Sequence, residues 1–505
     1  MTTSLLATWA EWSTSLQLGD VPERVLERAR LQHLSTAGAV HTSLAAGQAL
    51  GLGLGRGKEP ALASGRRVGQ KQALRYHAGN AAAWDCCDQI LWGPAGPGSV
   101  CGTWSSAREH TLGELLLATV IANELSARVG AAGLLAPNSA TGWTGLQAVA
   151  AAAAIARLRG SSAETTANAL ALSLSDGGCA STAGLATSHH VRARVAANAV
   201  VAGASAVDAA SDGIAGPVSL LDTDAWYQAL GCPVVLRHVF GGLGTAWLTD
   251  TLWFKLTAGS PWHNVAMQAL EEIHSRHIRA ADKRLRPDQW TEAVIRVSLP
   301  VWAADQVASV DREGLTWSLR AAYATSSRAH QLGPREFGES FWAEEGGDIA
   351  ELAGRIRVEH AWEHTVAAIR GLAEQGILGG LTLGQLKHAA GAFRTALPGP
   401  ETPAGADLLE LAKLGPLAGG LSAGAFDPRA FRYVLPMDVK VHTTRGGFWP
   451  ETRSLPEGSP GWNWEDTLAR VQAKFAGGDP ARTELAQELL TRSTESSAED
   501  FVSAL

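Results

Sequence analysis

The sequence predicts a mainly α-helical protein with a smaller α+β part. Strong helix formers dominate the first half, above all the alanine-rich run at 145–158. Segments that alternate apolar and polar residues and are rich in β-branched side chains at 292–300, 355–359 and 437–447 predict strands. An amphipathic helical pattern returns in 462–475. The order is therefore a helical domain, an α+β domain and a helical tail.

The length of the chain supports this division. With 505 residues it is too long for one simple core, and its 46% hydrophobic and 18% charged content is typical of globular proteins. We expect the helical domain over 1–255, the α+β domain over 256–460 and the tail over 461–505. Within the α+β domain, a Gly/Leu/Ala-rich helical insertion is expected at about 361–430.

Individual helices follow from apolar residues at a spacing of three and four. Two amphipathic helices are expected in 4–40, the second starting at Asp20 with Pro22 in its first turn. In the helix predicted from Leu112, Glu114 and Glu124 are expected on the solvent side. Further helices are predicted at 163–174, 192–210, 315–332, 361–376 and 480–493.

Composition and charge exclude several classes of protein. The net charge of −7 and the lack of Lys/Arg clusters argue against nucleic-acid binding. Five cysteines without CxxC spacing predict neither a disulfide framework nor a zinc site, and fit a reducing cytoplasm. The N-terminus lacks the basic region of a signal peptide, and the most apolar run, 146–156, is too short to span a bilayer. A cytoplasmic protein without membrane contact is expected.

The stretch 75–98 is the strongest candidate for polar chemistry. It begins as a helix of small residues and presents Asp85 and Asp88 at i,i+3, a spacing that places both on one helix face. Gly-Pro pairs at 93–94 and 96–97 then break the helix. Burial against Trp and Ala would raise the pKa of Asp85 and suit it to proton transfer. A solvated turn or a capped helix end is the alternative.

A series of short motifs follows in order along nearly the whole chain. They are Asn80–Asp88, 145–160, Gly213-Ile-Ala-Gly-Pro217, Phe254-Lys255-Leu256, Trp317-Ser318-Leu319 and Ala473-Lys474-Phe475. In order and spacing they resemble the MmgE/PrpD family, which includes 2-methylcitrate dehydratase and cis-aconitate decarboxylase. The resemblance implies a large all-α domain built from both chain ends, with an inserted α+β lid domain. It also implies a homodimer, no metal, no organic cofactor, and eliminations or decarboxylations of small polycarboxylates.

The resemblance assigns several site residues. Asp85 and Asp88 match the first and last acids of the family's acidic run, and Gln89 replaces the threonine that follows it. Lys255 matches the lysine at the junction with the lid domain. Arg192 stands where the family has a lysine, although Arg194 competes for that role. These cations would hold the carboxylate of an anionic substrate.

The histidines of the family are missing at their aligned positions. Gly96 stands where the family has a catalytic histidine before proline. His189, His190 or His263 would supply the acid–base group instead. The alternative is that these histidines are polar loop residues without a catalytic role. Tyr323 lies two residues after the position of the family tyrosine.

Tryptophans crowd the same motifs and predict broad apolar walls for a larger, less charged ligand. We expect Trp92 and Trp143 to bind the substrate. Trp84 and Trp262 stand in the same motifs. The leading hypothesis is a cofactor-independent lyase for a small organic acid or a carboxylated secondary metabolite. An isomerase or cyclase of the same fold and a non-catalytic binding or scaffold protein are the alternatives. Cys86 and Cys87 are expected to fill the core rather than to act as nucleophiles.

Overall fold

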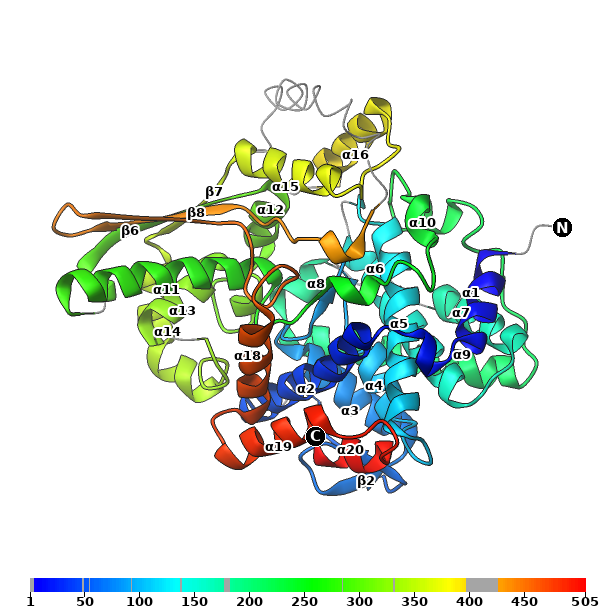
Figure 1. The fold of residues 1–505 in the computed structure, drawn as a ribbon. Coiled ribbons are helices and arrows are strands. Elements are labelled where there is room, and N and C mark those ends of the chain that lie inside the picture. The colour runs from blue at the N-terminus through cyan, green and yellow to red at the C-terminus, as the bar shows by residue number, and fades with distance from the viewer. Residues whose placement is uncertain are drawn as a thin grey trace.

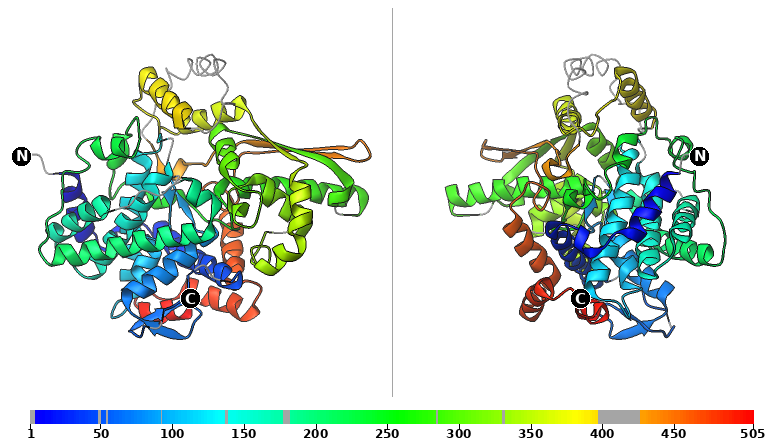
Figure 2. Two further views of the ribbon diagram at one scale, coloured as in Figure 1. Left: turned by 180° about the vertical axis from the view of Figure 1, so that it is seen from behind. Right: turned by 45° about the vertical axis from the view of Figure 1, so that its right-hand side comes forward.

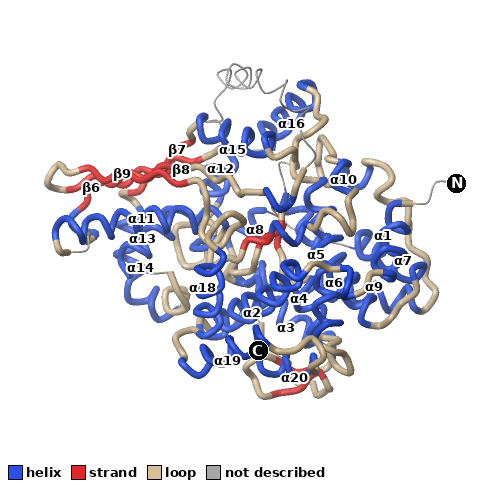
Figure 3. Tube along the Cα trace, in the orientation of Figure 1, coloured by secondary structure: helices blue, strands red, loops and turns tan. Residues whose placement is uncertain are grey.

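The protein is mainly helical, as the sequence predicts, with a four-stranded sheet that projects from one side of the helical body (Figure 1). This computed structural model describes residues 4–505 except 48–49, 54, 92, 137–138, 177–181, 284, 330–331 and 397–425. In the tube view the four strands of this sheet lie on the projecting side, and the remainder is mostly helical with a few short strands (Figure 3).

The first half of the chain is helical apart from short strands. Its elements are α1 (Leu5–Ser15), η1 (Leu18–Asp20), α2 (Glu23–Ala45), β1 (Glu59–Ala61), β2 (Arg66–Val68), α3 (Gln70–Ala83), β3 (Gln89–Ile90), β4 (Gly93–Pro94), α4 (Ser99–Trp104), α5 (Leu112–Ala132), α6 (Ser139–Leu158), α7 (Ala163–Asp176), α8 (Thr182–Thr187), α9 (His189–Ser211), α10 (Ala225–Ala229) and η2 (Arg237–Phe240). The second helix begins after Pro22, later than predicted, because 18–20 forms a separate turn.

The second half alternates helices with the strands of the sheet. Its elements are η3 (Leu248–Thr251), β5 (Leu252–Trp253), α11 (Pro261–Ala281), η4 (Pro287–Gln289), β6 (Trp290–Val297), α12 (Leu299–Val307), η5 (Gly314–Thr316), α13 (Leu319–Ala329), α14 (Glu339–Ala353), β7 (Ile356–His360), α15 (Trp362–Glu374), α16 (Leu383–Ala396), η7 (Pro428–Ala430), β8 (Met437–Thr443), β9 (Phe448–Arg453), α18 (Trp464–Ala476), α19 (Pro480–Thr491) and α20 (Ala498–Ala504). The three predicted strands are thus confirmed as β6, β7 and β8.

Small side chains let the central helices approach one another closely. α6 contacts α5, α7 and α9, and its residues 148–156 are almost completely buried. Gly203 of α9 lies so close to α6 that a Cβ placed there would be 2.2 Å from the carbonyl oxygen of Ala148. This contact matters for the site because α9 also carries Arg192.

Replacing Gly203 with alanine is expected to lower the free energy of unfolding by about 1–3 kcal/mol, because the added methyl group clashes with backbone. The matched control is Gly347→Ala in α14, where a Cβ would meet nothing within 4 Å. Alanine there is expected to stabilise the helix by up to about 1 kcal/mol. Urea unfolding of both variants measures the difference, and equal effects would contradict close packing of α6 on α9.

The helix α5 lies in the core of the helical body. It is long and apolar enough to cross a membrane by length and composition, but 94% of its most apolar window is buried inside the protein. Glu114 is solvent-exposed at its start, as predicted, in a capping box with Thr111. The prediction for Glu124 is wrong. Its side chain is buried because Arg128 supplies a partner at i,i+4.

The projecting sheet has the strand order β7-β6-β8-β9. β6 is parallel to β7 and antiparallel to β8, and β8 and β9 form a hairpin. The long helix α11 packs on β8 and β9, and α13 packs on β7 and α11. The start of α11 faces the helical body and carries His263, so this helix links the sheet to the candidate site.

The C-terminal helices return to the N-terminal ones. α18 and α19 pack on α2 and α20 packs on α5, so the red C-terminal segment lies beside blue N-terminal segments (Figure 2). The backbone of Thr111 pairs with that of Ser497. Of the expected insertion, the structure shows α15 and α16, and 397–425 lies outside the described residues. The domain boundaries at 255 and 460, and a lid role for the α+β part, stay predictions.

Candidate active site

The loop after α3 separates the two predicted carboxylates. The helix ends at Ala83, and Asp85 has φ of +49°, in the left-handed region. Aspartate adopts this conformation more readily than most residues because its short side chain bonds locally. The prediction that Asp85 and Asp88 share one helix face is therefore wrong, and each carboxylate has its own partners.

Asp85 forms an ion pair with Lys255. The Nζ of Lys255 is 2.8 Å from Oδ1 of Asp85, and it also donates to the Asp85 carbonyl oxygen. The Lys255 side chain is fully buried, whereas that of Asp85 is 14% exposed. Pairing of β3 with β5, which sets Gln89 opposite Trp253, brings Lys255 to the loop. The carboxylate is thus the member of the pair that reaches the surface.

Asp88 is the more deeply buried carboxyl group. Its Oδ1 accepts from Ser35 Oγ at 2.6 Å and from the Lys255 backbone N–H at 3.1 Å, and Oδ2 has no hydrogen-bond partner in the described part of the chain. Burial raises the pKa of Asp88 to about 6, although Lys474 and these hydrogen bonds oppose the rise. The burial that was expected to raise the pKa of Asp85 is therefore found at Asp88. Asp88 also positions the backbone of Lys255.

Lys474 of α18 is a site residue that the sequence analysis did not assign. Its Nζ donates to Ser35 Oγ at 2.9 Å and to the carbonyl oxygens of Cys86 and Lys255, each at 2.8 Å. A C-terminal helix thereby holds the loop and Lys255 together. The signal in the sequence is the Ala-Lys-Phe motif at 473–475, which resembles the family but does not by itself assign a role to Lys474.

Arg192 lies at the start of α9 and is buried. Its Nε donates to the Ala83 carbonyl oxygen at 2.9 Å and Nη1 donates to that of Leu185, whereas Nη2 has no partner among the residues that the structure describes. Burial lowers its pKa to about 10, and the nearby charge of Asp85 opposes that shift. The competing Arg194 is exposed. Arg192 therefore offers a free donor within electrostatic range of Asp85.

His263 is buried in the first turn of α11. Its Nδ1 bonds to Ser260 Oγ, and its Nε2 has no partner of normal hydrogen-bond geometry. Burial lowers the pKa of His263 to about 3, and the Ser318 backbone and the Asp85 charge offset this only in part. The ring is therefore neutral at pH 7. We call Asp85, Asp88, Lys255, Lys474, Arg192 and His263 the Asp85 cluster.

Residues 7–233 match the family model of the MmgE/PrpD N-terminal domain. This part of the chain belongs to the MmgE/PrpD family. The matched range contains Asp85, Asp88 and Arg192. Membership of MmgE/PrpD suggests a dehydratase-type lyase at the level of the family. No curated protein matches the chain.

His189 borders the Asp85 cluster through Trp84, on which its ring stacks. The two rings stack at 4.1 Å between centroids, and His189 Nδ1 is 2.8 Å from Oε2 of Glu313. Burial lowers the pKa of His189, and Glu313 opposes the shift. His190 is exposed and lies against the His189 ring. Trp84 thus lies between this histidine pair and the Asp85 loop that follows it.

The remaining predicted residues are placed less directly. Tyr323 packs edge-on against Trp290 of the sheet, whereas its helix neighbours Ala321 and Ala322 pack with Trp84. Gln89 is buried in β3, and Trp143 packs in a small apolar group with Leu185, Val195 and Trp317. Trp92 lies outside the described residues. Burial raises the pKa of Cys87 to about 12, which suits a core residue rather than a nucleophile.

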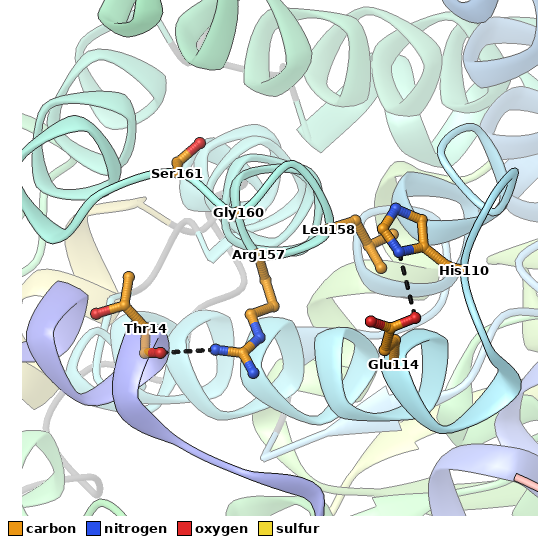
Figure 4. A pocket seen from close by; sticks show the side chains of 7 residues that line it. All are labelled: Thr14, His110, Glu114, Arg157, Leu158, Gly160 and Ser161. Carbon is orange, nitrogen blue, oxygen red and sulfur yellow. Dashed lines mark hydrogen bonds and ion pairs between the residues drawn. The ribbon is translucent and has the colours of Figure 1, made fainter. Parts of the chain in front are cut away.

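A surface hollow of about 280 Å³ lies away from these residues (Figure 4). Arg157 enters it but already donates to the carbonyl oxygens of Ser13, Thr14 and Leu16 at the end of α1. The hollow is therefore a less suitable anion site than the Asp85 cluster. Among the described residues, no group of three or more His, Cys, Asp or Glu side chains could hold a metal ion.

Proposed function

We propose that this MmgE/PrpD protein is a lyase that needs no cofactor and acts on a small organic acid at the Asp85 cluster. The observation that carries the proposal is the ion pair of buried Lys255 with partly exposed Asp85. It combines a carboxylate that can take a proton with a cation that can stabilise developing negative charge.

The charges of the Asp85 cluster favour an anionic ligand. Lys255, Lys474 and Arg192 provide three cations, against the carboxyl groups of Asp85 and Asp88. Because burial raises the pKa of Asp88 to about 6, part of its negative charge is lost near that pH. Nη2 of Arg192, which has no partner among the described residues, is available to bind a substrate carboxylate.

The proposed reaction is a proton transfer coupled to elimination. Asp85 takes a proton from the carbon next to a substrate carboxylate, and the electron pair of that C–H bond forms a C=C bond as a leaving group departs from the adjacent carbon. In a decarboxylation, the C–C bond breaks to release CO₂, and an acid returns a proton to the carbanion. Lys255 stabilises the charge that develops in either case.

His263 is the best-placed substitute for the histidine that Gly96 replaces. A neutral imidazole can donate or accept a proton at Nε2, depending on which tautomer the Ser260 hydroxyl selects. The charges of Asp85, Lys255 and Arg192 all act on His263, which puts it within electrostatic range of the proposed chemistry.

The test incubates the purified full-length chain in D₂O with a panel of small carboxylic acids and follows the products by NMR. The panel includes cis-aconitate, 2-methylcitrate and aromatic keto acids. We expect deuterium exchange next to a carboxylate, or a new alkene, with a panel member other than cis-aconitate and 2-methylcitrate. Asp85→Asn should slow this exchange or alkene formation by at least about 10²-fold.

The products also separate the alternatives. A rearranged isomer without loss of a group would favour the isomerase or cyclase hypothesis. Binding of an acid with neither exchange nor product would favour a non-catalytic protein and reject the lyase. Turnover of cis-aconitate or 2-methylcitrate would show that the substrate has not changed. The homodimer and the cytoplasmic location also stay proposals.

A further inference from the structure

Within the part of the chain that the structure describes, two buried indole N–H groups have no acceptor. They are Nε1 of Trp262, in the first turn of α11, and Nε1 of Trp317, which directly follows η5. Their rings meet edge to face, with centroids 5.4 Å apart and planes at 87°. The hydroxyl of Thr316 is also buried and unpartnered. Three potential donors thus belong to two chain segments that touch.

These free donors need an explanation because indole nitrogen only donates. Leaving a buried donor unpaired destabilises a protein, so such groups are rare. An edge-to-face pair can direct at most one of its two N–H groups at the face of the other ring. The second N–H, and the hydroxyl of Thr316, would still lack an acceptor. A bound oxygen atom would satisfy them.

The tryptophan pair adjoins the Asp85 cluster. Trp262 precedes His263, and the Ser260 N–H donates to the carbonyl oxygen of Thr316 at 2.8 Å, which joins the two segments. Trp317 packs on Leu185, whose carbonyl oxygen accepts from Arg192. Leu185 therefore links the segment of Trp317 to Arg192.

The surroundings define the kind of acceptor. A carboxylate would need cations, and those belong to the Asp85 cluster, whereas Trp317 is surrounded by Leu185, Trp143 and Val195. Neutral donors among apolar side chains suit an uncharged carbonyl oxygen. We propose that Trp262 and Trp317 determine specificity by binding a carbonyl oxygen in the apolar part of a substrate whose carboxylate lies at Arg192. The inference rests on the proposed function for the carboxylate end.

The test compares two acids of nearly equal size, 4-oxo-4-phenylbutanoate and 4-phenylbutanoate, by isothermal titration calorimetry. We expect the keto acid to bind the full-length protein about threefold to tenfold more tightly, the range of one or two hydrogen bonds. Trp262→Phe and Trp317→Phe retain an aromatic ring but remove the donor. Each should reduce the preference, and the double variant should abolish it without weakening 4-phenylbutanoate.

Trp226→Phe is the matched control, because that indole already donates to the Leu174 carbonyl oxygen. It should leave the preference intact. A preference that survives the double variant overturns the proposal, as does the absence of binding of both acids at up to about 10 mM. When the acids bind, Arg192→Gln separates a failure at the tryptophan pair from a failure of the proposed function. If Arg192→Gln weakens neither acid, the carboxylate site itself is wrong.

Discussion

Replacing Arg128 with methionine is expected to lower the free energy of unfolding by about 3–5 kcal/mol, because the change leaves a buried carboxylate without its cation. Arg128 Nη1 is 2.6 Å from Oε2 of Glu124, and the two side chains are 0% and 1% exposed. Glu124 also accepts from the backbone N–H groups of Leu248 and Thr249. Two backbone N–H groups do not replace a cation, so without Arg128 the Glu124 carboxylate would be a buried charge without a counter-ion.

The same pair positions the segment that leads to Lys255. Arg128 donates to the carbonyl oxygens of Gly241 and Ala246, and Glu124 holds the start of η3. η3 runs directly into β5, and Lys255 follows two residues after that strand. Loss of the pair should therefore also reduce any activity that depends on Lys255.

Guanidinium unfolding at pH 7 measures the Arg128→Met effect. Arg159→Met is the control, because Arg159 pairs with Asp208 at the surface, where such bridges contribute less than about 1 kcal/mol. In the double variant Glu124→Leu/Arg128→Met, much of the lost stability should return, since no unpaired charge remains. Equal effects of Arg128→Met and Arg159→Met would contradict the assignment of a buried, functionally placed pair.

Glu124 shows why the fold was easier to predict than the environment of each side chain. The apolar spacing of α5 and the β-branched alternation of β6 are local patterns, so they are visible in a short window of sequence. Whether a charged residue on such a helix faces solvent depends on segments more than a hundred positions away. No periodicity in α5 indicates that η3 covers Glu124.

The site was predicted in part for the same reason. Asp85, Lys255 and Arg192 were found because motifs around them resemble a family, whereas spacing alone gave a helix-face pair that does not exist. The bond between Lys255 and Asp85 joins residues 170 positions apart, and that between Lys474 and Ser35 spans 439. Contacts at such separations have no local signal. The left-handed conformation of Asp85 likewise belongs to a loop that Lys474 holds through the Cys86 carbonyl oxygen, a contact between distant parts of the sequence.

Replacing Lys255 with methionine is expected to reduce turnover of the active acid by about 10²–10³-fold, the range for removing one group that stabilises developing charge. Methionine fills a similar volume in the fully buried position. Asp85 keeps contact with solvent through its exposed portion, so its carboxylate can hydrate. The chain should therefore stay folded, which circular dichroism and the unfolding midpoint would show.

A double-mutant cycle distinguishes catalysis from simple support of the loop. If Asp85 and Lys255 act as one unit, Asp85→Asn combined with Lys255→Met should reduce kcat little more than either change alone. Lys474→Met should act through position, with a loss of stability that accompanies any loss of rate, because its Nζ donates three hydrogen bonds that hold Ser35, Cys86 and Lys255 together. Lys71→Met removes an exposed lysine that pairs with Asp208 and should change neither quantity. Fully additive losses at Asp85 and Lys255 would argue that the pair does not share one catalytic step.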